Sequence, residues 1–433
     1  MRIALLWFPV QHHIRLDAAD PHAAAMARAV ETCVHCGFCL PACPTYRVLG
    51  EEMDSPRGRI VLMKGVLEGD LPLEDALPHI DRCLGCLACV TACPSGVRYG
   101  ELLLPFRAGA EQTGRSVVER IRRRFLLSTL ESPALFRISA RLGRLARPAA
   151  RLLPPSMRTM LALLPDRLPP AASLPAIVPA RGPRRARVAL LAGCVQQVLD
   201  PDINHATLRV LAANGVEVVV PAGQGCCGAL ALHSGDERRA RRRAATLLRA
   251  FPDDVDAVVT NAAGCGSAMK EYGNVFRGGP QESDGHRFSA RVRDVAEFLH
   301  DLGFVAPPAP GEPLTVAYHD ACHLAHAQGI RTAPRALLAA VSNVQVVEIP
   351  DGEICCGSAG LYNVEHPATA GDLGARKAQA ILSTGAQAVA AGNIGCLVQI
   401  RTHLARSGAA VPVLHTMQLL DRAYGRDEAV GGV

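Results

Sequence analysis

The chain has 433 residues, of which 49% are hydrophobic and 4% aromatic, and it carries a formal net charge of +6. This length and composition allow two to four folded domains with aliphatic cores. No stretch approaches the roughly 18 to 20 consecutive apolar residues that a membrane-spanning helix needs. We therefore expect a cytoplasmic protein, and peripheral attachment to the inner face of the cytoplasmic membrane stays open.

The first ten residues, MRIALLWFPV, are mostly apolar. The apolar run is at the short end for the core of a signal peptide, and no clear cleavage site of small residues follows it. We expect this stretch to begin a helix or to form a buried strand.

Two cysteine runs follow, CVHCGFCLPACP at 33–44 and CLGCLACVTACP at 83–94. Each has the spacing C-x2-C-x2-C-x3-C-P, which is the pattern of bacterial two-cluster ferredoxins. Three cysteines spaced in this way wrap a loop around one cluster, and the fourth points towards the cluster of the other run. The expected ligands of one [4Fe-4S] cluster are Cys33, Cys36, Cys39 and Cys93, and those of the other are Cys83, Cys86, Cys89 and Cys43.

Two other uses of these cysteines fit the sequence poorly. A structural zinc ion prefers two separated C-x2-C pairs that close one tetrahedron, and such a chain would be a structural protein that binds partners. Disulfide-rich chains are usually small and secreted, whereas this chain is long and has well-formed core segments. Iron–sulfur clusters are therefore the favoured interpretation.

The segment between the two runs predicts how this part of the chain folds. It is longer than a compact ferredoxin with a βαββαβ scaffold requires, and it contains helix-like stretches such as RGRIVLMKGVLEG. We predict a helical ferredoxin-type two-cluster domain over 1–108. Arg57, Arg59 and Arg98 follow the runs closely, and the sequence leaves open whether they tune the clusters or lie at the surface.

Residues 109–185 are predicted to form an arginine-rich helical connector that ends in the proline-rich linker LPPAASLPAIVPARGPRRAR. Between 107 and 187 there are seventeen arginines, no lysine and four acidic residues, a charge of about +13. This amphipathic segment could lie on anionic lipid, dock an acidic partner subunit or cover the ferredoxin domain. We expect no nucleic-acid binding, because no recognition module accompanies the charge.

The last part of the chain contains an internal repeat with halves at 186–305 and 306–433. The first half has RVALLAGCVQQV, VEVVVPAGQGCCGAL and VDAVVTNAAGCGSAM, and the second has LTVAYHDACHLAH, VQVVEIPDGEICCGSAG and AQAVAAGNIGCLVQI. Strands that alternate with helices predict parallel sheets, so we expect a duplicated α/β cysteine-rich domain with a pseudo-two-fold axis. The fold class of the whole chain is thus expected to be multidomain, α+β followed by α/β.

Every cysteine of the repeats falls just after a predicted strand. Because ligands sit beyond the carboxyl ends of the strands in such sheets, the four cysteines of each half should converge. They are Cys194, Cys226, Cys227 and Cys265 in the first half and Cys322, Cys355, Cys356 and Cys396 in the second. Each set could hold a further [4Fe-4S] cluster, act as a redox dithiol or be a remnant of a cluster site. A third cluster is expected in the second repeat, if one is present.

The sequence offers no catalytic residue. His233, His319, His403 and His415 are expected to be hydrogen-bonded structural groups. No glycine-rich nucleotide loop opens a helix after a strand, so the chain should carry no flavin or NAD of its own.

The chain resembles the iron–sulfur subunit of bacterial glycolate oxidase (glycolate dehydrogenase) along nearly its whole length. The likeness is carried by CVHCGFCLPACPTYRVLGEEMDSPRGRI, DRCLGCLACVTACPSGVRYGELL, GCCGAL, GCGSAMKEYG, ICCGSAGLYNVEHP and NIGCLVQI. The resemblance implies an electron-transfer subunit whose FAD-binding partners oxidise glycolate to glyoxylate. It also implies that the electrons pass on towards membrane quinone.

The order of a twin ferredoxin followed by two Cys-Cys-Gly (CCG) repeats is shared more widely. It is similar to subunits of anaerobic glycerol-3-phosphate dehydrogenase, lactate-utilisation proteins and heterodisulfide reductase. A subunit of a related lactate or glycerol-3-phosphate dehydrogenase, or a CCG protein that reduces a disulfide or quinone, is therefore the alternative function. One departure is that some CCG relatives end each repeat in C-x2-C, whereas Ala262 and Asn393 take the place of the first cysteine here.

Overall fold

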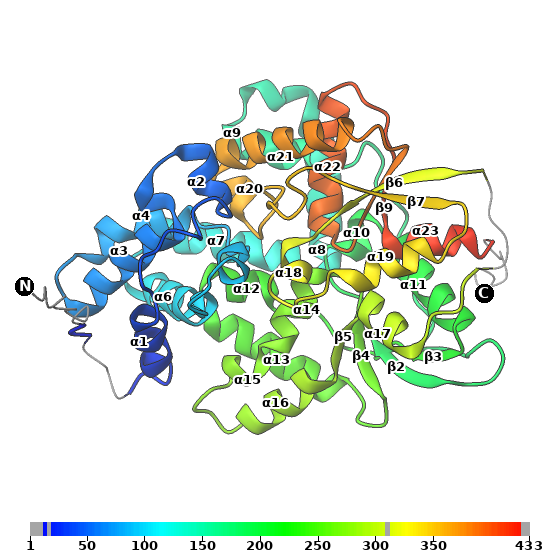
Figure 1. Ribbon diagram of the computed structural model, residues 1–433, viewed down its shortest axis with the longest axis horizontal. Coiled ribbons are helices and arrows are strands. Elements are labelled where there is room, and N and C mark those ends of the chain that lie inside the picture. The colour runs from blue at the N-terminus through cyan, green and yellow to red at the C-terminus, as the bar shows by residue number, and fades with distance from the viewer. Residues whose placement is uncertain (1–11, 15–18, 308–311, 426–433) are drawn as a thin grey trace, which may run out of the picture.

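The computed structural model describes residues 12–14, 19–307 and 312–425. Figure 1 shows a group of helices at the N-terminal end of the molecule and two α/β halves towards the C-terminal end. The helix or strand expected for the first ten residues lies outside the described residues.

The two cysteine runs lie in a helical domain. Its elements are α1 (Ala23–Glu31), α2 (Pro44–Leu49), the 3-10 turn η1 (Glu52–Asp54), α3 (Pro56–Glu68), α4 (Leu73–Asp81), α5 (Ala88–Thr91) and α6 (Tyr99–Thr113). Met26, Val30, Ile60, Leu102 and Phe106 belong to its apolar core. The prediction of a helical ferredoxin-type domain is confirmed.

Helix α3 shows how the sequence sets these boundaries. The hydroxyl oxygen of Ser55 accepts the backbone N–H of Gly58 at 3.0 Å, and Pro56 suits the first helical position because no N–H is needed there. The helix ends at Gly69, whose φ of 84° is left-handed. A Cβ atom at Gly58 would lie 2.0 Å from the carbonyl oxygen of Glu52, so only glycine fits at this close approach.

The first repeat contains a five-stranded sheet in the order β1-β3-β2-β4-β5. Its strands are β1 (Ile177–Val178), β2 (Ala186–Leu190), β3 (Val216–Val219), β4 (Ala257–Thr260) and β5 (Val292–Asp294), and all neighbours are parallel except β1 and β3. Its helices are α10 (Gln196–Leu199), α11 (Asp202–Ala213), α12 (Ala229–Ser234), α13 (Glu237–Ala250), α14 (Ala263–Lys270), α15 (Tyr272–Val275), α16 (Glu282–Arg291) and α17 (Val295–Leu302).

The second repeat contains a four-stranded parallel sheet in the order β7-β6-β8-β9. Its strands are β6 (Leu314–His319), β7 (Val344–Glu348), β8 (Ala388–Ala391) and β9 (Val413–His415). Its helices are α18 (Cys322–Ala325), α19 (Thr332–Ala339), α20 (Tyr362–Glu365), α21 (Pro367–Leu382), α22 (Ile394–Arg406) and α23 (Thr416–Ala423). The strand order repeats β3-β2-β4-β5 of the first sheet, so the predicted duplicated α/β domain is confirmed.

The two repeats share one core. Helices α11 and α17 of the first repeat pack against α23 and α19 of the second, between the two sheets (Figure 1). Val188 of the first repeat and Leu337 of the second belong to the same cluster of buried apolar side chains. An ion pair of 2.7 Å between Arg209 and Asp421 also joins the halves.

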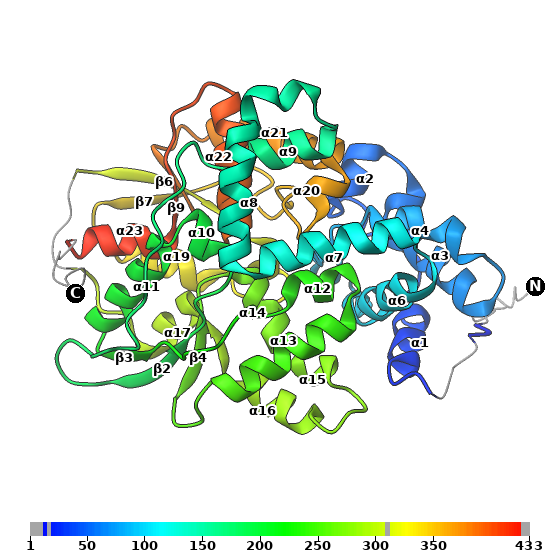
Figure 2. The same ribbon diagram turned by 180° about the vertical axis from the view of Figure 1, so that it is seen from behind.

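Three helices connect the helical domain to the sheets. They are α7 (Val117–Glu131), α8 (Pro133–Ala146) and α9 (Pro155–Ala162), with the 3-10 turn η2 (Arg147–Leu152) between the last two. Figure 2 shows α7 and α8 lying across one face of the molecule. Because α7 contacts α12, α8 contacts α10, and α9 contacts α20 and α21, the connector covers mainly the repeats.

Candidate metal centres

The two cysteine loops follow the same backbone course. In the first loop His35 and Gly37 have φ angles of 54° and 85°, and in the second Gly85 and Leu87 have φ angles of 66° and 61°. These left-handed residues turn the chain on both sides of the middle cysteine of each run. The conformation costs about 1 to 2 kcal/mol for a residue other than glycine, so both loops hold a conformation that the backbone alone does not favour.

The structure places the fourth cysteine of the second run beside the first run. Cys93 lines the same pocket as Cys33, Cys36 and Cys39, and Cys89 also contributes to its wall. Burial raises the pKa of Cys33, and the charge of Cys93 adds to that rise. Three thiols of one run and the last thiol of the other therefore surround one space.

The fourth cysteine of the first run lies beside the second run in the same way. Burial raises the pKa of Cys86 and of Cys89 well above the ordinary value, and the charge of Cys43 adds to both. The donor sets thus fit two thiolate-ligated clusters with exchanged fourth ligands. The ligand assignment itself stays a prediction.

Two buried arginines set the charge around the second run. The guanidinium of Arg59 lies 3.9 Å from the sulfur of Cys43, and that of Arg107 donates a hydrogen bond to the carbonyl oxygen of Cys83 at 2.5 Å. Burial alone would raise the pKa of Cys83, but the charges of Arg59 and Arg107 hold it below the ordinary value. Fixed cations of this kind stabilise thiolate ligands and raise the reduction potential of an anionic cluster.

The other two arginines noted in the sequence lie nearer the surface. Arg57 donates to the carbonyl oxygen of His35 at 3.1 Å. Arg98 is 77% exposed and pairs with Glu101. Of the three, Arg59 is the one buried beside a cysteine.

The four cysteines of each repeat lie close together. The sulfur atoms of Cys194 and Cys226 are 3.6 Å apart in the first repeat, and those of Cys322 and Cys355 are 3.9 Å apart in the second. Hydrogen bonds from neighbouring thiols hold the pKa of Cys226 and of Cys356 well below the ordinary value. The close contact of the sulfur atoms in each set suits the ligands of a shared metal centre.

Each set is completed by a cysteine in the first turn of a helix. Cys265 is the third residue of α14 and Cys396 the third residue of α22. The partial positive charge of a helix N-terminus favours an anionic ligand at this position. In the second repeat the amide of Asn393 also donates to the sulfur of Cys396 at 3.5 Å, whereas Ala262 of the first repeat offers no such group.

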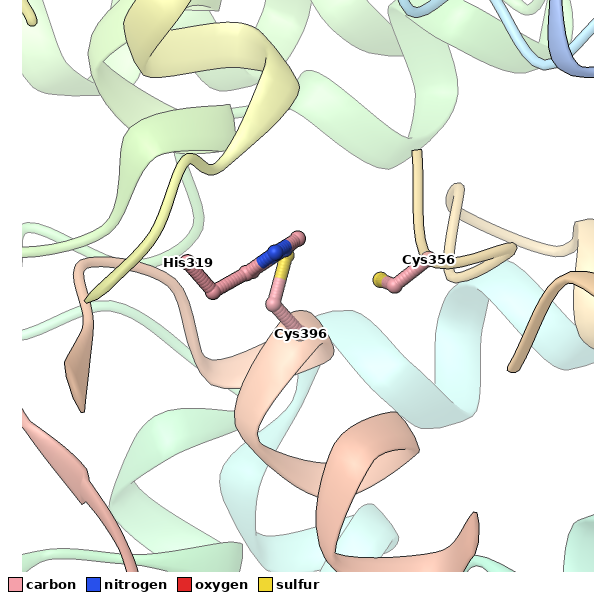
Figure 3. Close-up of side chains that lie close together, drawn as sticks. All are labelled: His319, Cys356 and Cys396. Carbon is pink, nitrogen blue, oxygen red and sulfur yellow. The ribbon is translucent and has the colours of Figure 1, made fainter. Parts of the chain in front are cut away.

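The histidines differ in their hydrogen bonds. His415 is structural as predicted, because its Nε2 N–H donates to the carbonyl oxygen of Asn261 at 2.8 Å and its Nδ1 accepts a backbone N–H at 3.1 Å. The prediction is wrong for His319, because neither of its ring nitrogens has a hydrogen-bond partner among the described residues. Figure 3 shows its ring pointing towards the sulfur of Cys396, with the sulfur of Cys356 facing both.

Of the other two histidines, His403 fits the prediction of a hydrogen-bonded structural group better than His233 does. The Nε2 of His403 lies 3.5 Å from the amide nitrogen of Gln399. The Nε2 of His233 has no hydrogen-bond partner in the part of the chain that the structure describes. The rings of His233 and His323 lie side by side, with centroids 4.7 Å apart.

A cleft of about 620 Å³ lies between the connector and the two cysteine sets. Part of its wall is formed by Cys194, Cys226, Cys227, Cys265, Cys322 and Cys396. Another part is formed by apolar side chains of α7, α8 and α9, among them Phe125, Phe136, Leu142, Met157 and Leu161. Both cysteine sets therefore open onto one largely apolar space.

The second cysteine run touches the second repeat. Cys86 belongs to the same buried apolar cluster as Cys322 and Cys355. The Nε2 of His323 lies 3.1 Å from the carbonyl oxygen of Gly85, which is part of the second run. The thiol sites thus follow one another from the first run to the second run, and then to the repeats around the cleft.

Known families and proteins match both parts of the chain. The family described as a 4Fe-4S dicluster domain matches residues 29–97, and the family described as a cysteine-rich domain matches residues 188–270 and 316–401. The chain is 36% identical over 416 residues to the probable glycolate oxidase iron–sulfur subunit of Bacillus subtilis. The alignment covers 91% of this chain and 94% of that protein. The chain is 37% identical over 425 residues to the glycolate oxidase iron–sulfur subunit of Escherichia coli, with 96% and 98% covered.

Two further likenesses are more limited. Lactate utilization protein A of Oceanobacillus iheyensis is 30% identical over 236 residues, which cover 54% of this chain and 96% of that protein. The crystal structure of a hypothetical protein from Helicobacter pylori superposes with a TM-score of 0.50 at 9% identity, covering 86% of this chain and 74% of that one. The second likeness concerns the fold alone.

The fold and the cysteine sites define an iron–sulfur protein in which a dicluster domain precedes two cysteine-rich repeats. More particularly, the chain belongs to the family of glycolate oxidase iron–sulfur subunits. It is therefore an iron–sulfur electron-transfer subunit of an oxidoreductase complex. No helix within the described residues is long and apolar enough to cross a membrane.

Two residues near these sites were missed by the sequence analysis. Arg107 entered only the charge count over 107–187, and no local pattern reveals that α6 brings its side chain to the carbonyl oxygens of Ile80 and Cys83. His323 follows Cys322 directly, but its bond to Gly85 depends on how two distant parts of the chain dock.

Proposed function

We propose that the chain is the electron-transfer subunit of a flavin-dependent glycolate oxidase complex. It takes electrons from glycolate oxidation on an FAD-binding partner and passes them towards quinone. The observation that carries this proposal is the unbroken succession of thiol sites from the first cysteine run to the cleft.

In this proposal the two cysteine runs hold two [4Fe-4S] clusters. Cys33, Cys36, Cys39 and Cys93 are the ligands of one, and Cys83, Cys86, Cys89 and Cys43 are those of the other. Each cluster supplies a one-electron redox site when bound. The chain contributes the charge around it, since Arg59 and Arg107 face the second run.

The first run is where the electrons arrive. Cys36 is exposed, and Val34 and Phe38 of the same loop are 65% and 67% exposed. Exposed apolar and aromatic side chains beside a redox loop suit contact with another protein. We place the flavin subunit at this surface, because the second run is covered by the second repeat.

The cleft is where the electrons leave. Glycolate loses two electrons and two protons when it becomes glyoxylate, and a quinone takes up two of each when it becomes a quinol. A largely apolar cleft of about 620 Å³ suits a lipophilic acceptor of this kind. The thiol sites on its wall bring the electrons to the same space.

Helix α8 supports a place for this step at the membrane surface. Leu135, Ile138, Leu142 and Leu145 recur along one face of it and are 50%, 53%, 62% and 78% exposed. Arginines lie between them in the sequence, and an apolar stripe flanked by arginine is typical of a helix at an anionic lipid surface. Leu142 also lines the cleft, so the stripe and the cleft adjoin.

Glycolate is favoured over lactate as the source of the electrons. The glycolate oxidase subunits match 91% and 96% of this chain, whereas lactate utilization protein A matches 54% of it. The residues that bind the substrate belong to the flavin partner in this proposal.

The complex, purified anaerobically with its flavin partner, tests the proposal. Glycolate should reduce the iron–sulfur EPR signals and a soluble quinone analogue. The chain alone should contain about eight irons in its two ferredoxin clusters and should not oxidise glycolate. A colourless chain with stoichiometric zinc would refute the proposal, and so would glycolate turnover without the partner. If lactate but not glycolate reduces the iron–sulfur signals, the substrate is lactate instead of glycolate.

A further inference from the structure

The second repeat contains a buried histidine that the first repeat lacks. When Cys194 is paired with Cys322, the same offset pairs Leu191 with His319. Both residues are 1% exposed. Leu191 packs in the apolar core of its half, as expected at the end of a strand buried in a parallel sheet. A histidine in the equivalent place needs a polar partner.

The described residues offer it no oxygen or nitrogen partner for a hydrogen bond. Neither ring nitrogen of His319 is bonded among the described residues. The ring faces sulfur instead, because one ligand atom each from His319, Cys356 and Cys396 lie within 4.8 Å of one another (Figure 3). The three come from the end of β6, the loop after β7 and the first turn of α22. Buried polar groups are paired in folded proteins, and imidazole with thiolates is a common ligand set for metals.

We propose that His319 is a nitrogen ligand, together with Cys356 and Cys396, of an iron–sulfur centre in the second repeat. Cys322 and Cys355 adjoin the same space, since the sulfur of Cys322 is 3.9 Å from that of Cys355 and Cys322 lines the same cleft as Cys396. Five donors exceed the four that a structural zinc ion takes, so they suit a centre with more than one iron. The inference rests on the proposed iron–sulfur function and adds to it a nitrogen ligand.

A nitrogen ligand in the second repeat would give its metal centre a different reduction potential from a centre in the first repeat. Neutral imidazole brings no negative charge, and its replacement of thiolate raises the reduction potential of a cluster, as in Rieske centres. The centre in the second repeat therefore draws electrons from the second cysteine run, whose Cys86 adjoins Cys322. The first repeat has Leu191 at the matching position and offers four thiols only.

Pulsed EPR of the full chain, loaded with iron and sulfide under anaerobic conditions and then reduced, tests this proposal. The spectrum should contain the hyperfine coupling of a directly bound nitrogen, and the chain should hold iron beyond that of its two ferredoxin clusters. His319→Leu copies the first repeat and should abolish the coupling. His319→Cys should keep the extra iron, lose the coupling and lower the potential of the centre.

His403→Gln is the matched control. Its ring is close enough to Cys356 to feel that charge, but its Nε2 already meets the amide of Gln399 at 3.5 Å. The nitrogen coupling should persist in this variant.

Three results would overturn the inference: nitrogen coupling that survives in both His319 variants, zinc in place of the extra iron, or iron confined to the two ferredoxin clusters. If His319→Leu fails to fold, the loss of the nitrogen coupling in His319→Cys still tests the inference. If glycolate still reduces the ferredoxin clusters of the whole complex while no nitrogen coupling is found, the proposed function stands and this inference alone fails.

Discussion

The Nε2 nitrogen of His323 lies 3.1 Å from the carbonyl oxygen of Gly85 and joins the second repeat to the second cysteine run. Burial lowers the pKa of His323, so the ring is neutral near pH 7 and has one N–H to donate. That N–H is used to hold the loop that carries Cys86 against the repeat. The distance between two neighbouring thiol sites is thus fixed by a hydrogen bond between residues far apart in the sequence.

Cys43→Ser should damage the cluster that is farther away in the sequence. Cys43 lies near Cys86 and Cys89, so its loss should remove the EPR signal of the second run and leave that of the first largely intact. Cys93→Ser should have the opposite effect, because Cys93 lines the pocket of the first run. Iron content and EPR of both variants check this, and loss of the nearer cluster in each would contradict the exchanged assignment.

Arg59→Met should destabilise the helical domain by roughly 1.5 to 3 kcal/mol, because it removes the buried charged donor to Asp54 and to the carbonyl oxygen of His79, while Asp54 keeps its ion pair with Arg82. It should also lower the potential of the second cluster, since a cation next to Cys43 is lost. Denaturant unfolding and a redox titration measure the two effects. Arg98→Met is the control, because that exposed arginine should matter by less than about 0.5 kcal/mol. Equal changes in stability and in cluster potential in both variants would contradict the role assigned to the buried charge of Arg59.

His415 should make the protein less stable in acid. Burial lowers the pKa of His415 to about 4, so the unfolded chain takes up a proton first as the pH falls below about 6.5. The free energy of unfolding should therefore be about 2 kcal/mol lower at pH 5 than at pH 8 on account of this residue.

The measurement for His415 is a comparison of unfolding curves for the native chain and His415→Asn at both pH values. Asp294 works in the opposite sense, because burial raises its pKa to about 7 and its contribution falls as the pH rises towards 7. That contribution is the same in both proteins and cancels in the difference. If the free energy of unfolding of His415→Asn falls as much between pH 8 and pH 5 as that of the native chain, His415 is not the cause of the loss.

Gly143→Phe should obstruct the cleft. A Cβ atom at Gly143 would lie 3.0 Å from a side-chain carbon of Leu161, and both residues line the cleft. Reduction of quinone by the complex should fall by about tenfold, which corresponds to roughly 1.4 kcal/mol of lost binding. Reduction of the iron–sulfur EPR signals of the complex by glycolate should not change. Gly109→Phe is the control, since a Cβ atom there would have no atom within 4 Å.

The double change Ile138→Asp and Leu145→Asp should weaken binding to anionic lipid vesicles. Both side chains are more than half exposed, so each change should alter stability by less than about 0.5 kcal/mol. Two apolar side chains together stabilise burial in lipid by roughly 3 kcal/mol, so binding should fall on the order of a hundredfold. Leu382→Asp on α21 is the control, and unchanged vesicle binding of the double variant would point to a protein partner on this face instead.

The sequence predicted those features that depend on local spacing. The cysteine intervals and the length of the insert indicated a helical two-cluster domain, and the alternation of apolar runs with helical patterns indicated the duplicated sheets. Both are periodicities that a single chain displays directly. The three alternatives for the connector could not be separated in this way. Its course over the repeats depends on contacts such as that of Leu127 with Ala231 and Ala240.

The arrangement of the sites relative to one another was also beyond the sequence. Cys86 meets Cys322 because two domains dock, and no spacing within either run reports that contact. The bonding of His319 was misjudged for a related reason. Most buried histidines find oxygen or nitrogen partners, and only the packed structure shows that this one has sulfur neighbours instead.

The burial of Leu84 and Cys86 against Cys322 has a consequence for how the protein is made. The loop of the second run is closed as soon as the two domains meet, whereas Cys36 of the first run remains exposed. If the second run holds the proposed cluster, we expect iron and sulfide to reach it before the two domains dock. We therefore expect the proposed first cluster to be rebuilt in the folded protein more readily than the second, which lies against the repeat.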